Sequence, residues 1–422
     1  MPEQTMPERI VIAGASLGGL RAAEQLRSAG WEGELVVIGD EAHPPYNRPP
    51  LSKEMLARPG TPEEALAALA FRPRRSATGI TWKLGSGVAA ANLARRTVTT
   101  HDGEVLGFSG LVVATGLRPA RVPVPGPLAG RHVVRTLEDT LALHTDLVPG
   151  ARVAVVGSGF IGCEVAATAS GLGCRVTLIE GTSGPMERPL GAELSSGVRR
   201  MLNDHGVATL AGTRVIRFLG GQRCTGLVLA DGRVLEADVV VEAVGSHANT
   251  EWLQGNGLDL DNGVECDEHL RVLDSAGTPV AGVVAVGDIA RYPDPLAGGP
   301  ARRVEHWATP TDTAKIAAPT LVAGLRGEEP GPAASPLPSF WTDLFALRIQ
   351  GVGSPARADA VGILEGDPAR PADGVALGYY REERLIGAVT AGLPAQKHLQ
   401  YRQAVLDAQA SGSRVPEPLP AA

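Results

Sequence analysis

The hydrophobic pattern of the chain contains one arrangement of strand, turn, helix and strand near its beginning. The apolar run Ile10–Ala13 predicts a buried strand, and good helix-forming residues follow at about Leu17–Ser28. A second apolar run, Leu35–Ile38, predicts another strand, after which Asp40 follows. Short continuous apolar runs of this kind are typical of strands buried in a parallel sheet. The segment Arg9–Asp40 is therefore expected to form a Rossmann-type βαβ unit.

The turn of this unit is rich in glycine and reads Gly14-Ala15-Ser16-Leu17-Gly18-Gly19. Glycines in such a turn allow a tight bend, close approach of the backbone to a pyrophosphate, and close packing of helix on strand. The unpaired N–H groups of the helix N-terminus then face the phosphates. Ser16 stands where the second glycine is usual, and its hydroxyl is itself able to reach a phosphate. The expected dinucleotide contacts are Gly14, Ser16, Leu17, Gly18, Asp40 and Glu41, of which the acids accept hydrogen bonds from a ribose diol.

A single copy of this pattern is also compatible with an ordinary glycine-rich turn. However, the segment Arg152–Glu180 repeats it with the full Gly157-x-Gly159-x-x-Gly162 turn, and Glu180 closes the second strand. Two such units in one chain predict two dinucleotides, one for each unit.

The second unit is predicted to bind NADH. A carboxylate at Glu180 accepts the 2′-hydroxyl of NAD and repels the 2′-phosphate of NADP. No basic residue occurs in Gly181-Thr182-Ser183, which follow it, and Arg188 is the nearest cation along the chain. The candidate NAD residues are Gly157, Gly159, Phe160, Ile161, Gly162, Glu180, Arg188 and Gly245.

Three further apolar runs end in glycine: Leu111–Gly116, Val239–Gly245 and Val283–Asp288. Any one of them alone is equally compatible with a buried strand and a turn. Together they fit a doubly wound domain that is interrupted by a second one, with backbone meeting cofactor at the carboxyl ends of the strands. Asp288 is an acid at a strand end, where it is able to bind the ribityl hydroxyls of a flavin.

A helix is predicted after Trp307, with Thr309 as its N-cap and Pro310 as its first helical residue. The partial positive charge of a helix N-terminus would stabilise an anionic reduced flavin ring. Trp307 is placed to lie against that ring, although a core aromatic is the alternative.

Composition and charge exclude several classes of protein. The net charge of -7 argues against a general nucleic-acid binder, without excluding a local basic patch. The four cysteines form no closely spaced pair, so neither an iron–sulfur cluster nor a redox dithiol is expected. The nine histidines show no ligand spacing, and no metal site is predicted. Met1 to Glu8 are polar, and no apolar run approaches the roughly 18 residues of a membrane helix, so a cytoplasmic protein is expected.

The run Pro45-Tyr46-Asn47-Arg48-Pro49-Pro50-Leu51-Ser52-Lys53 is the most specific stretch of the sequence. On this run and the two glycine turns, the chain resembles the ferredoxin reductases of bacterial oxygenase systems, which are FAD flavoproteins with a glutathione-reductase-like fold. The resemblance extends from Arg9 to about Ile349, and more loosely through Gly378–Val405.

The resemblance implies roles for particular residues. It places Arg48 and Lys53 along FAD and pairs Lys53 with Glu164, as the two catalytic candidates. A lysine near flavin N5 stabilises charge on the reduced ring, whereas a purely structural ion pair is the alternative. The remaining FAD residues are Val88, Ala114, Thr115, Gly116, Arg135, Gly287, Asp288, Glu305, His306 and Trp307. The sequence departs from the family at Ser16 and at Leu344, where glutamine is usual.

The predicted fold class is α/β, with two Rossmann-type dinucleotide-binding domains, for FAD and NAD, and a smaller α+β C-terminal domain. Residues 1–117 and 249–326 are expected to form the FAD domain, and 118–248 the NAD domain. Residues 327–422 are expected to form an interface domain, with a proline-rich linker over 327–338 and a disordered tail from about Gly412.

The predicted function is electron transfer from NADH through FAD to a small [2Fe-2S] ferredoxin that supplies an oxygenase. FAD bridges the two-electron donor and the one-electron acceptor. Two alternatives are an NADH-binding signalling flavoprotein and a flavin NADH oxidase, although Pro45–Met55 lacks the cysteine typical of such oxidases. Oligomeric state stays open, since a monomer suffices for the chemistry. Ferredoxins are usually acidic, so a basic docking patch is expected. The candidates are Arg72, Arg74, Arg75, Arg302 and Arg303, for which a solvated surface without a docking role is the alternative.

Overall fold

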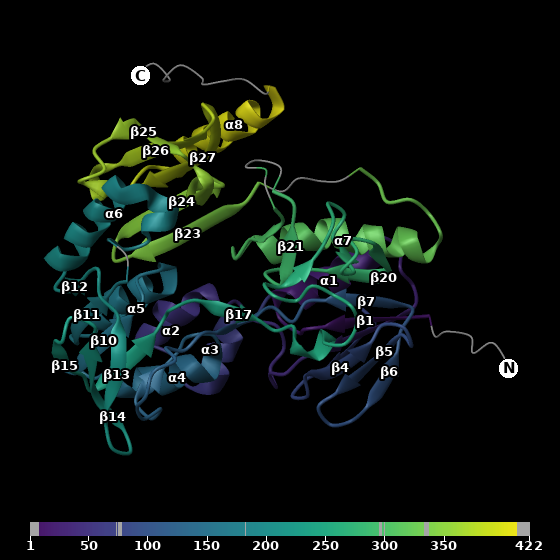
Figure 1. The fold of residues 1–422 in the computed structure, drawn as a ribbon, viewed down its shortest axis with the longest axis horizontal. Coiled ribbons are helices and arrows are strands. Elements are labelled where there is room, and N and C mark those ends of the chain that lie inside the picture. Colours follow the sequence, from purple (N-terminus) through teal and green to yellow (C-terminus); the bar gives the residue numbers. More distant parts are fainter. Residues whose placement is uncertain are drawn as a thin grey trace. The chain divides into compact units, whose positions relative to one another are not determined.

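The computed structural model of the 422-residue chain describes residues 8–72, 74, 78–181, 183–294, 298, 300–332 and 337–411 (Figure 1). Arg75, Thr182, the first seven residues, part of the proline-rich segment and the tail from Gly412 lie outside the described residues. In the ranges that are described, no helix is both long and apolar enough to cross a membrane.

The chain divides into two compact units. The first consists of Met1–Asn47, Leu69–Arg118 and His247–Pro338, and the second of Arg48–Ala68, Pro119–Ser246 and Ser339–Ala422. The chain changes unit within two residues of the predicted boundaries at 117/118 and 248/249. The C-terminal segment and residues 48–68 group with the second unit, which also contains most of the predicted NAD domain. The division into three domains stays a prediction.

A six-stranded sheet forms the centre of the first unit, in the order β19-β20-β7-β1-β2-β3. Its strands are β19 (Arg271–Leu273), β20 (Pro279–Ala285), β7 (Gly110–Val113), β1 (Arg9–Ala13), β2 (Glu34–Ile38) and β3 (Ile80–Lys83). All neighbours are parallel except β19 and β20. Each strand between β20 and β2 is fully buried at its carboxyl end, as the apolar runs predict.

Helices α1 (Leu17–Ser28) and α7 (Thr309–Leu325) contact each other, and α7 contacts β20 (Figure 1). The bounds of α1 are those predicted. The remaining elements of this unit are β4 (Val88–Asn92), β5 (Thr97–Thr100), β6 (Val105–Gly107), the 3-10 helix η2 (Glu251–Leu253), β18 (Val264–Glu265), β21 (Ala290–Tyr292) and β22 (Arg302–Arg303). The short strands β8 (Leu117–Pro119) and β17 (Ser246–Ala248) contain two of the points at which the chain changes unit.

The predicted start of α7 is wrong by one residue. Ala308 caps the helix, Thr309 is its first residue and Pro310 its second. The backbone of Ala308 is already helical, and its carbonyl accepts hydrogen bonds from the amides of Thr311 and Asp312. Proline is compatible with this place, because the amides of the first helical turn need no intrahelical acceptor.

The second unit contains a parallel five-stranded sheet in the order β12-β11-β10-β16-β9. Its strands are β12 (Ala208–Leu210), β11 (Arg175–Ile179), β10 (Arg152–Val156), β16 (Val239–Glu242) and β9 (Arg131–His132). The helices of this part are η1 (Pro49–Ser52), α2 (Glu54–Ala57), α3 (Pro62–Leu69), α4 (Leu137–Asp146), α5 (Phe160–Gly171) and α6 (Glu187–Asp204), and the antiparallel strands are β13 (Val215–Gly220), β14 (Cys224–Leu229) and β15 (Val234–Glu236).

The C-terminal part of the second unit is an antiparallel sheet in the order β23-β24-β27-β26-β25, contacted by α8 (Ala395–Ser411). Its elements are β23 (Ser339–Leu344), β24 (Leu347–Gly353), η3 (Pro355–Arg357), β25 (Ala360–Gly366), η4 (Pro371–Asp373), β26 (Val375–Arg381) and β27 (Arg384–Ala391). Burial alternates along β23, so Phe340, Thr342 and Leu344 share its buried face.

Candidate functional site

The glycine turn of the first unit depends on two glycines. Gly14 has a φ of 122°, and a Cβ there would lie 2.1 Å from the carbonyl oxygen of Ala114. A Cβ on Gly19 would lie 1.9 Å from the carbonyl oxygen of Gly14, whereas at Gly18 the nearest atom would be 3.6 Å away. Gly19, which the sequence reasoning did not select, therefore allows α1 to pack on β1, and Gly18 is not required sterically.

The turn of the second unit repeats this geometry. A Cβ on Gly157 would lie 2.2 Å from the carbonyl oxygen of Ala243, and one on Gly162 would lie 2.0 Å from that of Gly157. Apart from the adjoining residues of the chain, no described atom lies within 4 Å of a Cβ built on Gly159 or on Gly245. Gly159 precedes α5 and provides no side-chain cap. The backbone at the start of α5 is thus open to a phosphate group, as a dinucleotide requires.

Glu180 directly follows β11 and is completely buried. Neither of its carboxylate oxygens has a hydrogen-bond partner within the described chain. Burial raises the pKa of Glu180, and the positive charge of Arg199 and the nearby Ser158 hydroxyl oppose that shift. Glu180 is thus a buried acceptor with unused lone pairs, at the end of a strand in a dinucleotide-binding unit. This arrangement suits the hydroxyls of a ribose diol, which would donate to it.

The cation beside Glu180 is not the one that sequence reasoning considered. Arg199, on α6, places its Nε 3.7 Å from Glu180 Oε1. Arg188 is exposed on the first turn of the same helix. The cation nearest along the chain is not the nearest in space, because α6 folds back so that Arg199, further along the helix, lies beside Glu180.

The predicted ribose acids of the first unit lie after β2. Asp40 is exposed, and a Cβ on Gly87 would lie 3.0 Å from its Oδ1. Glu41 accepts a hydrogen bond of 2.5 Å from the hydroxyl of Tyr46. Val88 follows Gly87 and is half-buried at the start of β4. Asp40 is therefore the more accessible of the two acids.

At the end of β7, Thr115 is tied to a loop of the same unit. Its hydroxyl donates to the carbonyl of Asn249 at 2.8 Å, and its own carbonyl accepts from Asn249 Nδ2 at 2.9 Å. The indole of Trp252 donates to the Thr115 hydroxyl at 3.3 Å. Gly116 follows with a φ of 61°, and Ala114 donates its amide to Ala13. Asn249 and Trp252 were not foreseen from the sequence.

The predicted flavin contacts near α7 are also held by neighbours in the first unit. The amide of Gly287 donates to Thr313 Oγ1 at 2.9 Å. The carbonyl of Asp288 accepts from Arg303 Nη1 at 3.3 Å, and Arg303 also pairs with Glu305 at 2.9 Å. These contacts fix the backbone that carries the Asp288 carboxylate.

Trp307 stacks on Phe71, with ring centroids 6.5 Å apart and an interplanar angle of 22°. The Arg21 guanidinium lies 5.4 Å from the centroid of the Phe71 ring. Next to Trp307, burial and the positive charge of Arg302 lower the pKa of His306 to about 4. His306 is therefore neutral at neutral pH.

The predicted pairing of Lys53 with Glu164 is present in the second unit, with Lys53 Nζ 2.8 Å from Glu164 Oε2. Two hydroxyl groups complete the environment of the carboxylate. Ser52 Oγ donates to Oε2 at 2.5 Å and Thr342 Oγ1 donates to Oε1 at 2.7 Å. Lys53 also donates to the carbonyl of Pro49 at 2.9 Å. Both oxygens of a buried carboxylate are thus satisfied, and the ammonium is held in one place.

Arg48 precedes this cluster in the chain. Its Nη1 donates to the carbonyl of Arg135 at 2.6 Å, and the amide of Arg135 donates to the N-terminal acid Asp139 of α4 at 3.0 Å. Phe160, at the start of α5, packs against Phe340 with ring centroids 5.1 Å apart. Ile161 beside it is an exposed hydrophobic residue. These contacts all lie within the second unit.

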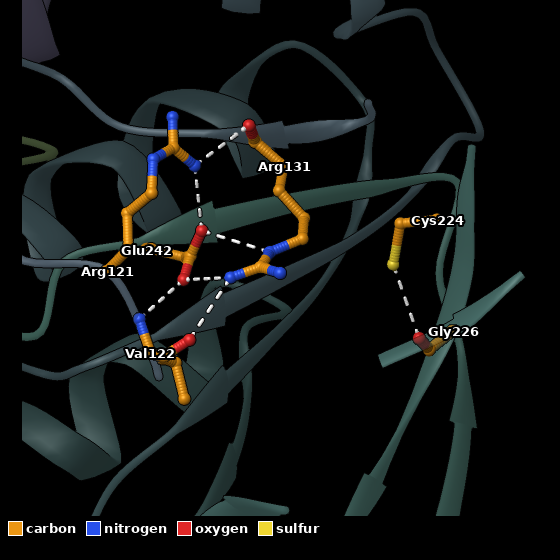
Figure 2. A network of polar contacts seen from close by, with 6 residues as sticks. All are labelled: Arg121, Val122, Arg131, Cys224, Gly226 and Glu242. Atoms are coloured by element: carbon orange, nitrogen blue, oxygen red, sulfur yellow. Dashed lines mark hydrogen bonds and ion pairs between the residues drawn. The ribbon is translucent and has the colours of Figure 1, made fainter. Parts of the chain in front are cut away.

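Another buried carboxylate, Glu242, ends β16. Arg131 binds both of its oxygens, at 3.1 and 2.8 Å, while Arg121 Nη1 and the amide of Val122 donate at 2.9 and 2.7 Å (Figure 2). The next residue supplies the carbonyl against which Gly157 packs. The network therefore supports the glycine turn, although the sequence showed only an apolar strand there.

The described part of the chain contains no group of histidine, cysteine or acidic residues that could hold a metal ion. All four cysteines are buried and unpaired. Burial raises the pKa of the thiols of Cys163, Cys174 and Cys266. Buried neutral thiols without a partner do not form a redox-active dithiol.

Comparison with known proteins gives consistent matches. Residues 8–314 match the family model described as pyridine nucleotide-disulphide oxidoreductase. The chain is 35% identical over 407 residues to the "Probable ferredoxin reductase" of Castellaniella defragrans, covering 94% of this chain and 95% of that one. It is 32% identical over 409 residues to putidaredoxin reductase of Pseudomonas putida, covering 95% and 92%. The solved covalent putidaredoxin reductase–putidaredoxin complex aligns with a TM-score of 0.84 and 31% identity, covering 97% of this chain and 94% of that chain.

Proposed function

Since the chain belongs to the pyridine nucleotide-disulphide oxidoreductase family, we propose that it is an NADH-dependent ferredoxin reductase. It takes electrons from NADH through bound FAD and passes them to a [2Fe-2S] ferredoxin that supplies an oxygenase. When bound, FAD accepts a hydride and releases electrons singly. The observation that carries the proposal is near full-length similarity to ferredoxin reductases, in a chain with two dinucleotide turns. We expect the protein to act in the cytoplasm, where NADH is supplied.

The choice of NADH rests on the buried carboxylate of Glu180. Its unsatisfied oxygens offer acceptors to the 2′- and 3′-hydroxyls of the ribose. A 2′-phosphate would bring a second negative charge into the same buried space, which is costly. The loop that follows β11 contains no basic residue to offset it.

The absence of an active dithiol supports electron transfer over disulfide chemistry. The disulfide reductases of this fold need two adjacent thiols, whereas the four cysteines here are buried and unpaired. Without a redox-active dithiol, we assign the control of flavin charge to Lys53 and the carboxylate of Glu164. Lys53 holds a positive charge at a fixed atom, and Ser52, Thr342 and Glu164 keep that atom in position.

The surface that receives the acceptor should be basic, because ferredoxins are usually acidic. Arg72 and Arg74 are exposed, and Arg74 also pairs with Glu24 at 3.3 Å. Arg303 is only 9% exposed and pairs with Glu305, and Arg302 pairs with the buried Asp294 at 2.6 Å. We therefore place Arg72 and Arg74 in the docking surface and assign Arg302 and Arg303 to internal ion pairs.

The test is anaerobic stopped-flow spectroscopy of the FAD-loaded protein. NADH should bleach the flavin quickly, NADPH slowly, and added [2Fe-2S] ferredoxin should then be reduced. Ferricyanide, a small one-electron acceptor that needs no docking surface, serves as the control. Rapid bleaching with electrons passing only to oxygen would support an NADH oxidase. A long-lived complex with slow reduction by NADH would support a signalling flavoprotein.

A further inference from the structure

The positive charge beside Glu180 comes from the middle of α6. Arg199 Nε lies 3.7 Å from Glu180 Oε1, and the Arg199 side chain is 31% exposed whereas that of Glu180 is not exposed at all. The Arg199 Nε has no hydrogen-bond acceptor among the described residues, and the Glu180 oxygens have no donor. The two groups therefore attract each other while both retain hydrogen-bonding capacity for a ligand.

The same guanidinium reaches the loop that follows β11. A Cβ on Gly184 would lie 2.8 Å from Arg199 Nη2, so this nitrogen stands directly over the loop backbone. A 2′-phosphate lies beside the acid at the end of the second strand when such a unit binds NADP, and an arginine nearby accommodates it. Arg199 thus extends from the acid that reads the ribose to the place that a phosphate would occupy.

A second acid explains why the site still rejects a phosphate. Glu187, the first residue of α6, adds a like charge that contributes to the raised pKa of Glu180. Its Oε2 is buried and also has no hydrogen-bond donor among the described residues. Around Glu180, two carboxylates and one guanidinium leave a net negative charge, which favours hydroxyl groups over a phosphate.

We propose that Arg199 is the second determinant of coenzyme choice in this chain. It holds Glu180 in position for the ribose hydroxyls of NADH, and it becomes the anchor of a 2′-phosphate once the charge of Glu180 is removed. The planar donors of a guanidinium match two phosphate oxygens, so no new basic residue is needed. This inference rests on the proposed NADH site in the second unit.

The experiment is calorimetric titration of the FAD-loaded protein with 5′-ADP and with 2′,5′-ADP. Wild type is compared with Glu180→Gln and with the double variants Glu180→Gln/Arg199→Gln and Glu180→Gln/Arg200→Gln. Arg200 is the matched control, because it is the adjacent arginine, is exposed and donates to the carbonyl of Ala369 at 3.2 Å. Glu180→Gln should strengthen binding of 2′,5′-ADP about tenfold or more. The Arg199 double variant should lose that gain, and the Arg200 double variant should keep it.

Retention of the gain in the Arg199 double variant, or no gain in Glu180→Gln, would overturn the inference while leaving the NADH site intact. Failure of 5′-ADP to bind to wild type would overturn the NADH site and the inference with it. If the Arg199 double variant loses 5′-ADP as well, Glu180→Gln/Arg199→Lys decides the matter. Partial recovery of 2′,5′-ADP binding with lysine supports a cationic anchor, and no recovery overturns it.

Discussion

Thr342 donates a hydrogen bond of 2.7 Å to Glu164, although 178 positions separate the two residues in the chain. The hydroxyl comes from the buried face of β23, and the carboxylate lies on α5. The other oxygen of Glu164 is occupied by Ser52 and Lys53. The C-terminal sheet thus completes the environment of the carboxylate that positions Lys53.

Replacing Thr342 with valine should destabilise the protein by about 1–3 kcal/mol, because one oxygen of a buried carboxylate loses its donor while the volume is kept. Thr342→Ser retains a hydroxyl and should cost clearly less. Urea denaturation of the FAD-loaded variants, followed by tryptophan fluorescence, measures both changes. Equal midpoints for valine and wild type would contradict the role given to this hydrogen bond.

Replacing Lys53 with methionine should be more harmful than the same change at Lys83. Both lysines lie 2.8 Å from a glutamate, but the Lys53 and Glu164 side chains are 16% and 6% exposed, whereas Lys83 and Glu104 are 34% and 42% exposed. Breaking a buried pair leaves an uncompensated charge and costs about 3–5 kcal/mol, while an exposed pair contributes about 0–1 kcal/mol.

With Lys53 beside the flavin, as proposed, Lys53→Met should also slow flavin bleaching by NADH about 10- to 100-fold, since a fixed positive charge stabilises the reduced ring. The flavin reduction potential should become more negative, a change that a purely structural pair would not produce. Lys83→Met should leave both quantities unchanged. An unaltered potential in Lys53→Met would support the structural alternative.

Local sequence patterns were enough to predict both βαβ units, including the bounds of α1 and the place of Glu180 at the end of β11. These features depend on strand and helix periodicity and on steric limits at glycine, which act over a few residues. The side chains that contact the buried acids from distant parts of the chain, and the role of Glu242 itself, were not accessible in this way. Arg199, Thr342 and Arg131 approach Glu180, Glu164 and Glu242 only through tertiary packing. The pairing of Lys53 with Glu164 was expected from the family resemblance, whereas the hydrogen bond from the neighbouring Ser52 to Glu164 was not.

Arg131 and Arg121 should differ sharply in their contribution to stability, although both bind Glu242 (Figure 2). Arg131 is 3% exposed, binds both carboxylate oxygens and lies 3.8 Å from the centroid of the Phe218 ring. Arg121 is 41% exposed and binds one oxygen. Arg131→Met should therefore cost about 3–5 kcal/mol, and Arg121→Met about 0–1 kcal/mol. Thermal unfolding of the two variants gives the comparison, and similar losses would show that burial does not decide how much each arginine contributes.

The lowered pKa of His306 predicts a loss of stability on mild acidification. Its pKa is 6.5 in its ordinary state and about 4 in the folded protein, because burial and the charge of Arg302 disfavour the protonated ring. Between these pH values the unfolded chain binds the proton more strongly. The free energy of unfolding should therefore fall as the pH drops from about 6.5 to 4, by at most about 3 kcal/mol.

The measurement is the urea midpoint of wild type and His306→Gln between pH 7.5 and 4.5, with His247→Gln, an exposed histidine, as the control. Other groups titrate at these or lower pH values. The raised pKa of Glu180 favours the folded state as the pH falls, whereas Asp231 and Asp238, held near a pKa of about 2 by Arg233 and Arg152, act only in stronger acid. Wild type and variant share all of these groups, so the difference between their curves isolates His306. The difference in midpoint between wild type and His306→Gln should grow as the pH falls below 6.5, and no such growth should occur for His247→Gln. Parallel curves for wild type and His306→Gln would show that the pKa of His306 is the same in the folded and unfolded states.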